Sequence, residues 1–251
     1  MAEKILEICT ASAQDAVEAE KGGADRVELN SSMVYGGLTP SIGQLIETKK
    51  RVDIPVVVMI RPRSGGFCYS DIEFEVMKED ARRAIKEGAD GIVFGILNSD
   101  GTIDRKRNRI MKEIAGEKEA VFHRAFDAVP DPFKGLDLLI EIGIDRVLTS
   151  GQKQRVEAGL DLAGKLISRA DKKIEILLGG KVREDNVEKI IKKTSAVQVH
   201  LSAFKEKYDS STEGQNEVAF NGLEALPENS FKITDKKIVR AVKNKISVLN
   251  Q

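Results

Sequence analysis

Eight short apolar segments run along this chain, and most of them end abruptly on a polar or charged residue. The segments are residues 5–8, 26–29, 55–60, 91–94, 120–122, 146–148, 174–178 and 197–199. An alternation of strand, polar end and helix, repeated eight times, predicts a parallel (β/α)8 barrel, also called a TIM barrel. The chain has 251 residues, close to the ~250 typical of such a barrel, so we expect a single domain.

The intervals between the apolar segments show the 3.6-residue periodicity of amphipathic helices. Helices are expected over residues 13–21, 41–50, 70–87, 105–115, 132–142, 154–169, 184–193 and 235–249. Residues 205–234 are rich in Ser, Asn, Glu and Gly and predict a long loop, either a lid or a packed tail. We therefore expect the eight strands of the barrel core within residues 1–204. The loop and C-terminal helix, residues 205–251, would complete the same domain.

A short phrase recurs where a helix should end and a strand begin. It reads Gly-Ala-Asp at 23–25 and at 88–90, and Gly-Ile-Asp at 143–145. Glycine supplies the left-handed residue that ends a helix, and Asp can turn the chain or pair with a following Arg. The spacing places the phrase at the N-terminal face of the barrel, where it has a structural role.

Composition narrows the classes of function. Lys plus Arg and Asp plus Glu both number 40, so the charge balance gives no sign of nucleic-acid or membrane-surface binding. The chain begins MAEKILEIC, without the apolar region of a secretory signal, and no apolar run approaches the ~20 residues of a membrane span. With two cysteines far apart in sequence, a reduced cytoplasmic protein is expected.

Two arginines flank a proline directly after the third strand. Arg61 and Arg63 stand where a pair of guanidinium groups could hold an anion, and a Gly-Gly pair follows them. The alternative is structural: the arginines could pair with the barrel carboxylates Glu7 and Glu28. Those carboxylates lie near the ends of the first two strands, where they could instead share a proton or hold a cation.

His123 directly follows the fifth strand, with Arg124 beside it and Asp127 four residues on. A histidine here could act as a general base or a metal ligand oriented by the carboxylate, or it could be a buried hydrogen-bonding residue. The chain has two histidines, and both fall at strand ends; the other is His200. This placement favours a role at the barrel mouth.

Small residues follow the sixth and seventh strands. Ser150 and Gly151 lie after the sixth, and Gly179 and Gly180 after the seventh. Such turns resemble the phosphate cradle that late loops form in many TIM barrels. They are candidates for binding the same anion as the arginines.

The residues themselves indicate a metal site less clearly than an anion site. Cys9 follows the first strand and Cys68 follows the arginine loop, so both thiols could reach the mouth. The chain shows no Cys-x-x-Cys and no histidine cluster. A soft-metal site at Cys9 and Cys68 and two ordinary packing cysteines both remain open.

Longer segments surround these residues. They are Glu7-Ile8-Cys9, Gly23-Ala24-Asp25-Arg26-Val27-Glu28-Leu29, Gly36-Gly37-Leu38-Thr39-Pro40-Ser41, Met59-Ile60-Arg61-Pro62-Arg63, Phe67-Cys68-Tyr69-Ser70, Phe122-His123-Arg124-Ala125-Phe126-Asp127 and Leu148-Thr149-Ser150-Gly151. Together they resemble the CutC family, meaning the copper homeostasis family and not the choline lyase of the same name. The resemblance implies a TIM barrel, a cytoplasmic location, a link to copper homeostasis or tolerance, and often a homo-oligomer. Many relatives carry a cysteine where this chain has Asn30.

Two hypotheses of function follow. In the first, copper homeostasis involves Cu(I) bound through Cys9 and Cys68. In the second, the barrel is an enzyme for a small phosphorylated or carboxylated metabolite. Arg61, Arg63 and Arg124 would hold the anion, while His123 with Asp127, or Glu7 with Glu28, would transfer protons.

Overall fold

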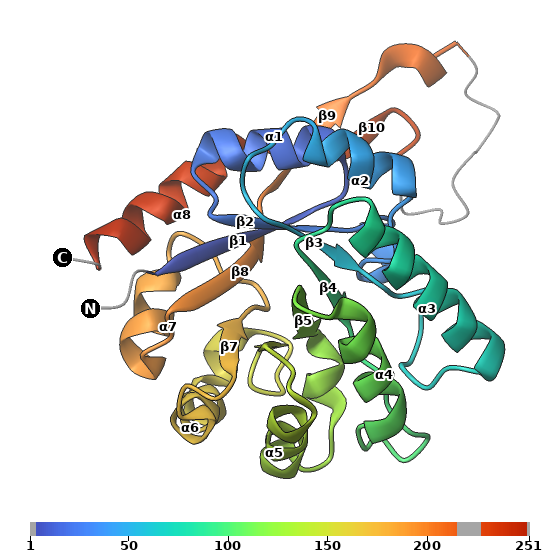
Figure 1. Ribbon diagram of the computed structural model, residues 1–251. Coiled ribbons are helices and arrows are strands. Elements are labelled where there is room, and N and C mark those ends of the chain that lie inside the picture. The colour runs from blue at the N-terminus through green and yellow to red at the C-terminus, as the bar shows by residue number, and fades with distance from the viewer. Residues whose placement is uncertain (1–3, 215–226, 250–251) are drawn as a thin grey trace.

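Eight parallel strands form a closed barrel in which each strand pairs with the next along the chain and β8 pairs with β1 (Figure 1). This computed structural model describes residues 4–214 and 227–249. The barrel strands are β1 (Ile5–Thr10), β2 (Arg26–Leu29), β3 (Val56–Met59), β4 (Gly91–Phe94), β5 (Glu119–Phe122), β6 (Arg146–Thr149), β7 (Glu175–Leu178) and β8 (Gln198–Ser202). The predicted (β/α)8 barrel is confirmed, and each strand falls on one of the eight apolar segments.

The described residues form eight α-helices, which surround the barrel (Figure 1). They are α1 (Ala13–Gly22), α2 (Ile42–Lys49), α3 (Asp71–Lys86), α4 (Arg105–Ala115), α5 (Pro132–Ile142), α6 (Leu160–Ala170), α7 (Val187–Thr194) and α8 (Lys236–Val248). Helix α6 begins six residues later than the sequence indicated. Residues Val156–Ala158 form a short 3-10 helix instead, and Gly159, which precedes α6, packs so closely on the β6 loop that a Cβ atom there would lie 2.1 Å from the Ser150 carbonyl oxygen.

Residues 205–234, expected to form one long loop after β8, contain strand residues at both ends. Strands β9 (Phe204–Tyr208) and β10 (Ser230–Thr234) pair antiparallel as a small separate sheet, and residues 215–226 of the expected loop lie outside the described residues. Both strands are short and largely exposed, so they show no apolar run that would reveal them. Helix α8 then closes the ring by packing on α1, where Val239 fills the space over Gly22.

The recurring Gly-x-Asp phrase has one role at all three places. Its glycines adopt left-handed backbone angles. Each aspartate then accepts a hydrogen bond from the first part of the preceding barrel strand: Asp25 from Leu6 N–H (2.7 Å), Asp90 from Val56 N–H (2.8 Å) and Asp145 from Ala120 N–H (2.8 Å). These bonds fix the N-terminal face, as the sequence predicted.

A chain of buried polar side chains runs through one side of the barrel interior. Arg146 and Arg26 both donate to Gln198 Oε1 (3.2 and 2.9 Å), Arg26 also donates to Glu7 (2.5 Å), and Glu7 contacts His200 Nδ1 (2.7 Å). The other side of the interior is apolar and consists of Val57, Met59, Val93 and Val121. Connected polar and charged side chains therefore extend from the N-terminal end of the barrel to its mouth.

Candidate functional site

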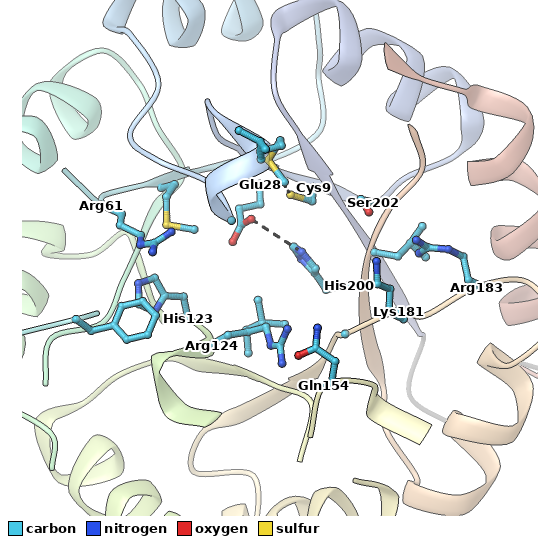
Figure 2. A pocket seen from close by; sticks show the side chains of 18 residues that line it. Cys9, Glu28, Arg61, His123, Arg124, Gln154, Lys181, Arg183, His200 and Ser202 are labelled. Atoms are coloured by element: carbon cyan, nitrogen blue, oxygen red, sulfur yellow. Dashed lines mark hydrogen bonds and ion pairs between the residues drawn. The ribbon is translucent and has the colours of Figure 1, made fainter. Parts of the chain in front are cut away.

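A cavity of about 540 Å³ opens at the carboxyl ends of the strands (Figure 2). Its wall includes residues from β1, β2, β3, β6 and β8 and from the loops that follow β5 and β7. Of the sequence-predicted site residues, six line it: Cys9, Glu28, Arg61, His123, Arg124 and Gly180. The mouth of the barrel is thus where side chains of mixed charge and chemistry converge.

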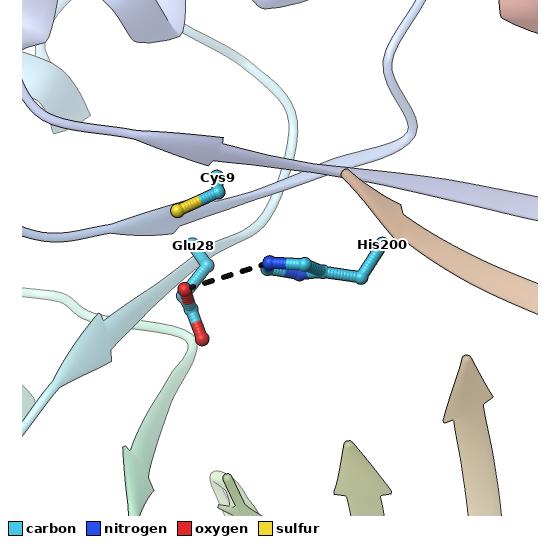
Figure 3. Close-up of side chains that lie close together, drawn as sticks. All are labelled: Cys9, Glu28 and His200. Atoms are coloured by element: carbon cyan, nitrogen blue, oxygen red, sulfur yellow. Dashed lines mark ion pairs between the residues drawn. The ribbon is translucent and has the colours of Figure 1, made fainter. Parts of the chain in front are cut away.

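Three side chains that could ligate a metal lie close together in this wall. The ligand-capable atoms of Cys9, Glu28 and His200 all lie within 4.8 Å of one another (Figure 3). His200 Nε2 lies 3.9 Å from Glu28 Oε2, while its Nδ1 contacts Glu7. Because Glu7 fixes the orientation of the imidazole ring, the Nε2 atom is the one turned toward Cys9 and Glu28.

Two further side chains complete the surroundings of Cys9. Its Sγ lies 3.8 Å from Met33 Sδ, and it accepts a contact from Asn30 Nδ2 at 3.4 Å. Asn30 Nδ2 also donates to Glu28 Oε2 (2.8 Å). A thiol, a thioether, an imidazole and a carboxylate therefore stand together at the mouth.

Burial and neighbouring charges shift the titration of this group. Burial alone would raise the pKa of Glu7, but Arg26 and His200 outweigh it and hold that pKa well below its ordinary value. Burial raises the pKa of Cys9 well above its usual range, and the charge of Glu28 adds to the effect. Burial and the nearby Glu7 raise the pKa of Glu28, against the opposing charge of His200. Burial would lower the pKa of His200, yet Glu28 and Glu7 raise it overall.

Arg61 is buried in the wall and holds the loops around the mouth. Its guanidinium group donates to the carbonyl oxygens of Tyr35 (2.8 Å), Gly37 (3.0 Å) and Gly65 (2.9 Å) and lies over the Phe67 ring. It forms no ion pair with a carboxylate of the described residues, so the expected alternative of pairing with barrel carboxylates is not what the structure shows.

His123 is buried in the same wall. Its Nδ1 accepts a hydrogen bond from Ala125 N–H (3.1 Å), which places the hydrogen of the neutral ring on Nε2, and Nε2 has no partner among the described residues. Burial and the charge of Arg61 lower its pKa to about 3. The ring also packs against Phe67 and over Gly95, where a Cβ atom would lie 2.5 Å from Nδ1. His123 is therefore a neutral donor held in one orientation.

Asp127 does not contact His123, so the proton-transfer pair expected from sequence is not assembled. Its carboxylate instead accepts hydrogen bonds from Thr149 Oγ1 (2.6 Å), from the Ser150 N–H (3.1 Å) and from Arg124 Nε (2.8 Å). Ser150 is fully buried in this network. Asp127 thus anchors the loop after β6, and Arg124 reaches the cavity with its charge already paired.

The glycines after β6 and β7 have different roles: two are engaged within the fold and one lines the cavity. The Gly151 N–H donates to Thr149 Oγ1 and the Gly179 N–H to Thr149 O, both at 3.0 Å, so these amides are engaged within the fold. Gly180 lines the cavity together with Lys181 and, two residues on, Arg183.

Arg63 and Cys68 lie away from this cavity wall. The guanidinium group of Arg63 pairs with Glu73 in the first turn of α3 and stacks on Tyr69. The Cys68 thiol is exposed, and it joins no group of metal-ligand side chains among the described residues. In the structure, Cys68 therefore does not join Cys9, and Arg63 does not line the cavity with Arg61.

Sequence reasoning does not select several residues that form the site. His200 can be placed at a strand end, but its contact with Glu7 depends on barrel closure between β8 and β1. Met33 begins a short 3-10 helix after β2, and Lys181 and Arg183 lie in the loop after β7, without a recognisable motif. A rule that any long polar side chain within a few residues of a strand end faces the mouth would have selected Lys181 and Arg183, but not Met33.

A closed (β/α)8 barrel with a polar cavity at the carboxyl ends of its strands defines a TIM-barrel protein. Comparison of the sequence with protein families matches residues 4–205 to the CutC family. The chain belongs to the CutC family.

Relatives of known name and structure agree. A CutC family protein from Treponema denticola is 49% identical over 228 residues, 91% of this chain and 93% of the relative. The human copper homeostasis protein cutC homolog is 44% identical over 239 residues, 95% of this chain and 87% of the relative. The crystal structure of CutC from Streptococcus agalactiae superposes with a TM-score of 0.76 at 34% identity, covering 78% of this chain and 97% of that one.

More distant structures share the barrel alone. N-(5'-phosphoribosyl)anthranilate isomerase from Pyrococcus furiosus matches with a TM-score of 0.58 at 16% identity, covering 98% of this chain and 100% of that one. In the part of this chain that the structure describes, no helix has the length and apolarity to cross a membrane.

Proposed function

We propose that the protein acts in copper homeostasis by binding Cu(I) at the mouth of the barrel, through Cys9 Sγ, Met33 Sδ and His200 Nε2. The observation that carries the proposal is the grouping of two sulfur atoms 3.8 Å apart with an imidazole and a carboxylate in one wall. Thiolate and thioether ligands favour Cu(I) over harder cations. The name of the human relative supplies the link to copper homeostasis.

The surroundings of His200 fit a metal ligand. A metal-binding histidine commonly gives its other ring nitrogen to a carboxylate, which fixes the tautomer and ring orientation. Glu7 occupies that place at 2.7 Å from Nδ1, and its lowered pKa keeps it ionised. Glu7 is thus assigned to positioning, which replaces the expected proton transfer between Glu7 and Glu28.

The thiol of Cys9 must lose its proton to bind the metal. Its raised pKa opposes that step, whereas the Asn30 amide group, which contacts Sγ at 3.4 Å, would stabilise the thiolate. Glu28, with its raised pKa, is placed to accept a proton beside the thiol. This proposal drops Cys68, whose exposed thiol lies outside the group.

Competition with a chromogenic Cu(I) chelator under reducing conditions tests the proposal. We expect the protein to bind one Cu(I) per chain. Cys9→Ser should weaken the affinity for Cu(I) strongly, and Met33→Leu should weaken it more mildly. Cys68→Ser is the matched control, since it removes the other thiol without touching the cluster. Equal binding by Cys9→Ser and the unaltered protein would contradict the proposal, as would loss of binding in Cys68→Ser.

The cytoplasmic location and the homo-oligomer implied by the family resemblance stay predictions. Light scattering on the purified protein tests the oligomer directly.

A further inference from the structure

The cavity wall carries more positive than negative charge. Arg61, Lys181 and Arg183 line it, and none of them forms an ion pair with a carboxylate of the described residues. Among the described residues, Glu28 is the one carboxylate in that wall, and it already contacts Asn30 and His200. Unpaired cations in a concave, partly enclosed site concentrate anions.

The loop between β7 and α7 presents two of these cations in a fixed arrangement. Asn186 is buried; its side chain donates to Lys181 O (3.0 Å) and accepts from Arg183 N–H (2.8 Å), which ties the loop at both ends. Gly180 and Lys181 both have positive φ, at 99° and 67°, and their amides have no hydrogen-bond partner within residues 4–214 and 227–249. Lys181 and Arg183 lie together on one side of the cavity (Figure 2).

The opposite side of the cavity holds hydrogen-bond donors without acceptors. His123 Nε2 and Arg61 Nε are both buried and have no partner among the described residues. His123 is 4% exposed and its ring cannot turn, because Phe67 and Gly95 pack against it. Buried donors are normally satisfied, so this side calls for acceptor atoms supplied from the cavity.

We propose that the cavity binds a small phosphorylated metabolite. The phosphate group contacts Lys181, Arg183 and the amides of Gly180 and Lys181, and the oxygen atoms of the rest of the molecule face Arg61 and His123. A tetrahedral dianion offers acceptors in several directions, which suits two cations and two amides better than a planar carboxylate. None of these residues is a proposed copper ligand, although the copper ligands line the same cavity, and the inference does not rest on copper binding.

Calorimetric titration of the metal-free protein with inorganic phosphate, and separately with succinate, tests the inference. The test variant is the double substitution Lys181→Gln with Arg183→Gln. The matched control is Arg169→Gln with Lys192→Gln, which removes the same charge from exposed ion pairs on α6 and α7. Thermal unfolding verifies that each variant is folded; should the test pair fail to fold, Lys181→Gln alone replaces it, because Lys181 is exposed.

Saturable phosphate binding, weakened roughly tenfold to a hundredfold in the test variant and unchanged in the control, is the expected result. Equal loss in both variants would reduce the effect to net charge and overturn the assignment of the loop. Binding of succinate without binding of phosphate would overturn the assignment of a phosphorylated ligand. The absence of any saturable binding would overturn the inference as a whole.

Discussion

Replacing His123 by glutamine should make the stability of the protein less sensitive to acid. His123 is buried and neutral, with its pKa lowered to about 3 from the ordinary 6.5. In the unfolded chain the same histidine takes up a proton near pH 6.5, whereas the folded protein does not. The stability that the neutral ring contributes is therefore complete above pH 6.5 and falls as the pH drops toward 3.

The magnitude follows from the interval between these pKa values. A pH of 5 lies about 1.5 units below the pKa of an unfolded histidine. At ~1.4 kcal/mol per unit, protonation lowers the free energy of the unfolded state by about 2 kcal/mol relative to the folded state. Glutamine keeps a polar group of similar length without this titration. Between pH 8 and pH 5 the unaltered protein should therefore lose about 2 kcal/mol more stability than His123→Gln.

Urea unfolding at both pH values, monitored by circular dichroism, measures the loss of stability in each protein. Comparing the two losses cancels the contributions of Glu7 and His200, which are the same in both proteins. Parallel loss of stability in the two proteins would refute the reasoning, because it would mean that the folded protein also protonates His123. A difference in stability between the two proteins at pH 8, where His123 is neutral in the folded and the unfolded state, reports lost packing and is subtracted in this comparison.

Two substitutions test the packing around the site. Gly95→Ala places a Cβ atom 2.5 Å from the His123 ring, so we expect about 1–3 kcal/mol of destabilisation in urea unfolding, and unchanged stability would contradict the close approach of the ring to this backbone. Asp127→Ala leaves the buried N–H of Ser150 without its acceptor and should cost roughly 2 kcal/mol or more, with faster amide hydrogen exchange confined to the loop after β6; protection equal to that of the unaltered protein would rule out the anchoring role.

The barrel could be predicted because its strands are buried on both faces. Such strands are continuous apolar runs, and the Gly-x-Asp phrase marks the helix-to-strand junctions by local backbone chemistry. The strands β9 and β10 could not be predicted, because they are exposed and pair across more than 20 intervening residues, which leaves no local pattern.

The site could be predicted in part. Position at a strand end correctly brought Cys9, Glu28 and His123 to the mouth, because parallel strands deliver their carboxyl ends to one face. Partners could not be assigned in the same way. Asp127 is four residues from His123 in sequence, yet its carboxylate turns to the β6 loop, since a side chain's direction depends on the tertiary contacts available to it.

The amino-acid sequence by itself determined the number of barrel strands, their order and the face on which polar residues gather, because these depend on the local alternation of apolar and polar residues. Tertiary structure alone decided which of those residues meet. Closure of β8 onto β1 brings His200 to Glu7 across 193 residues, and the folding of the loop after β2 brings Met33 to Cys9. Contacts between distant segments depend on how the whole barrel packs, and no local pattern encodes them.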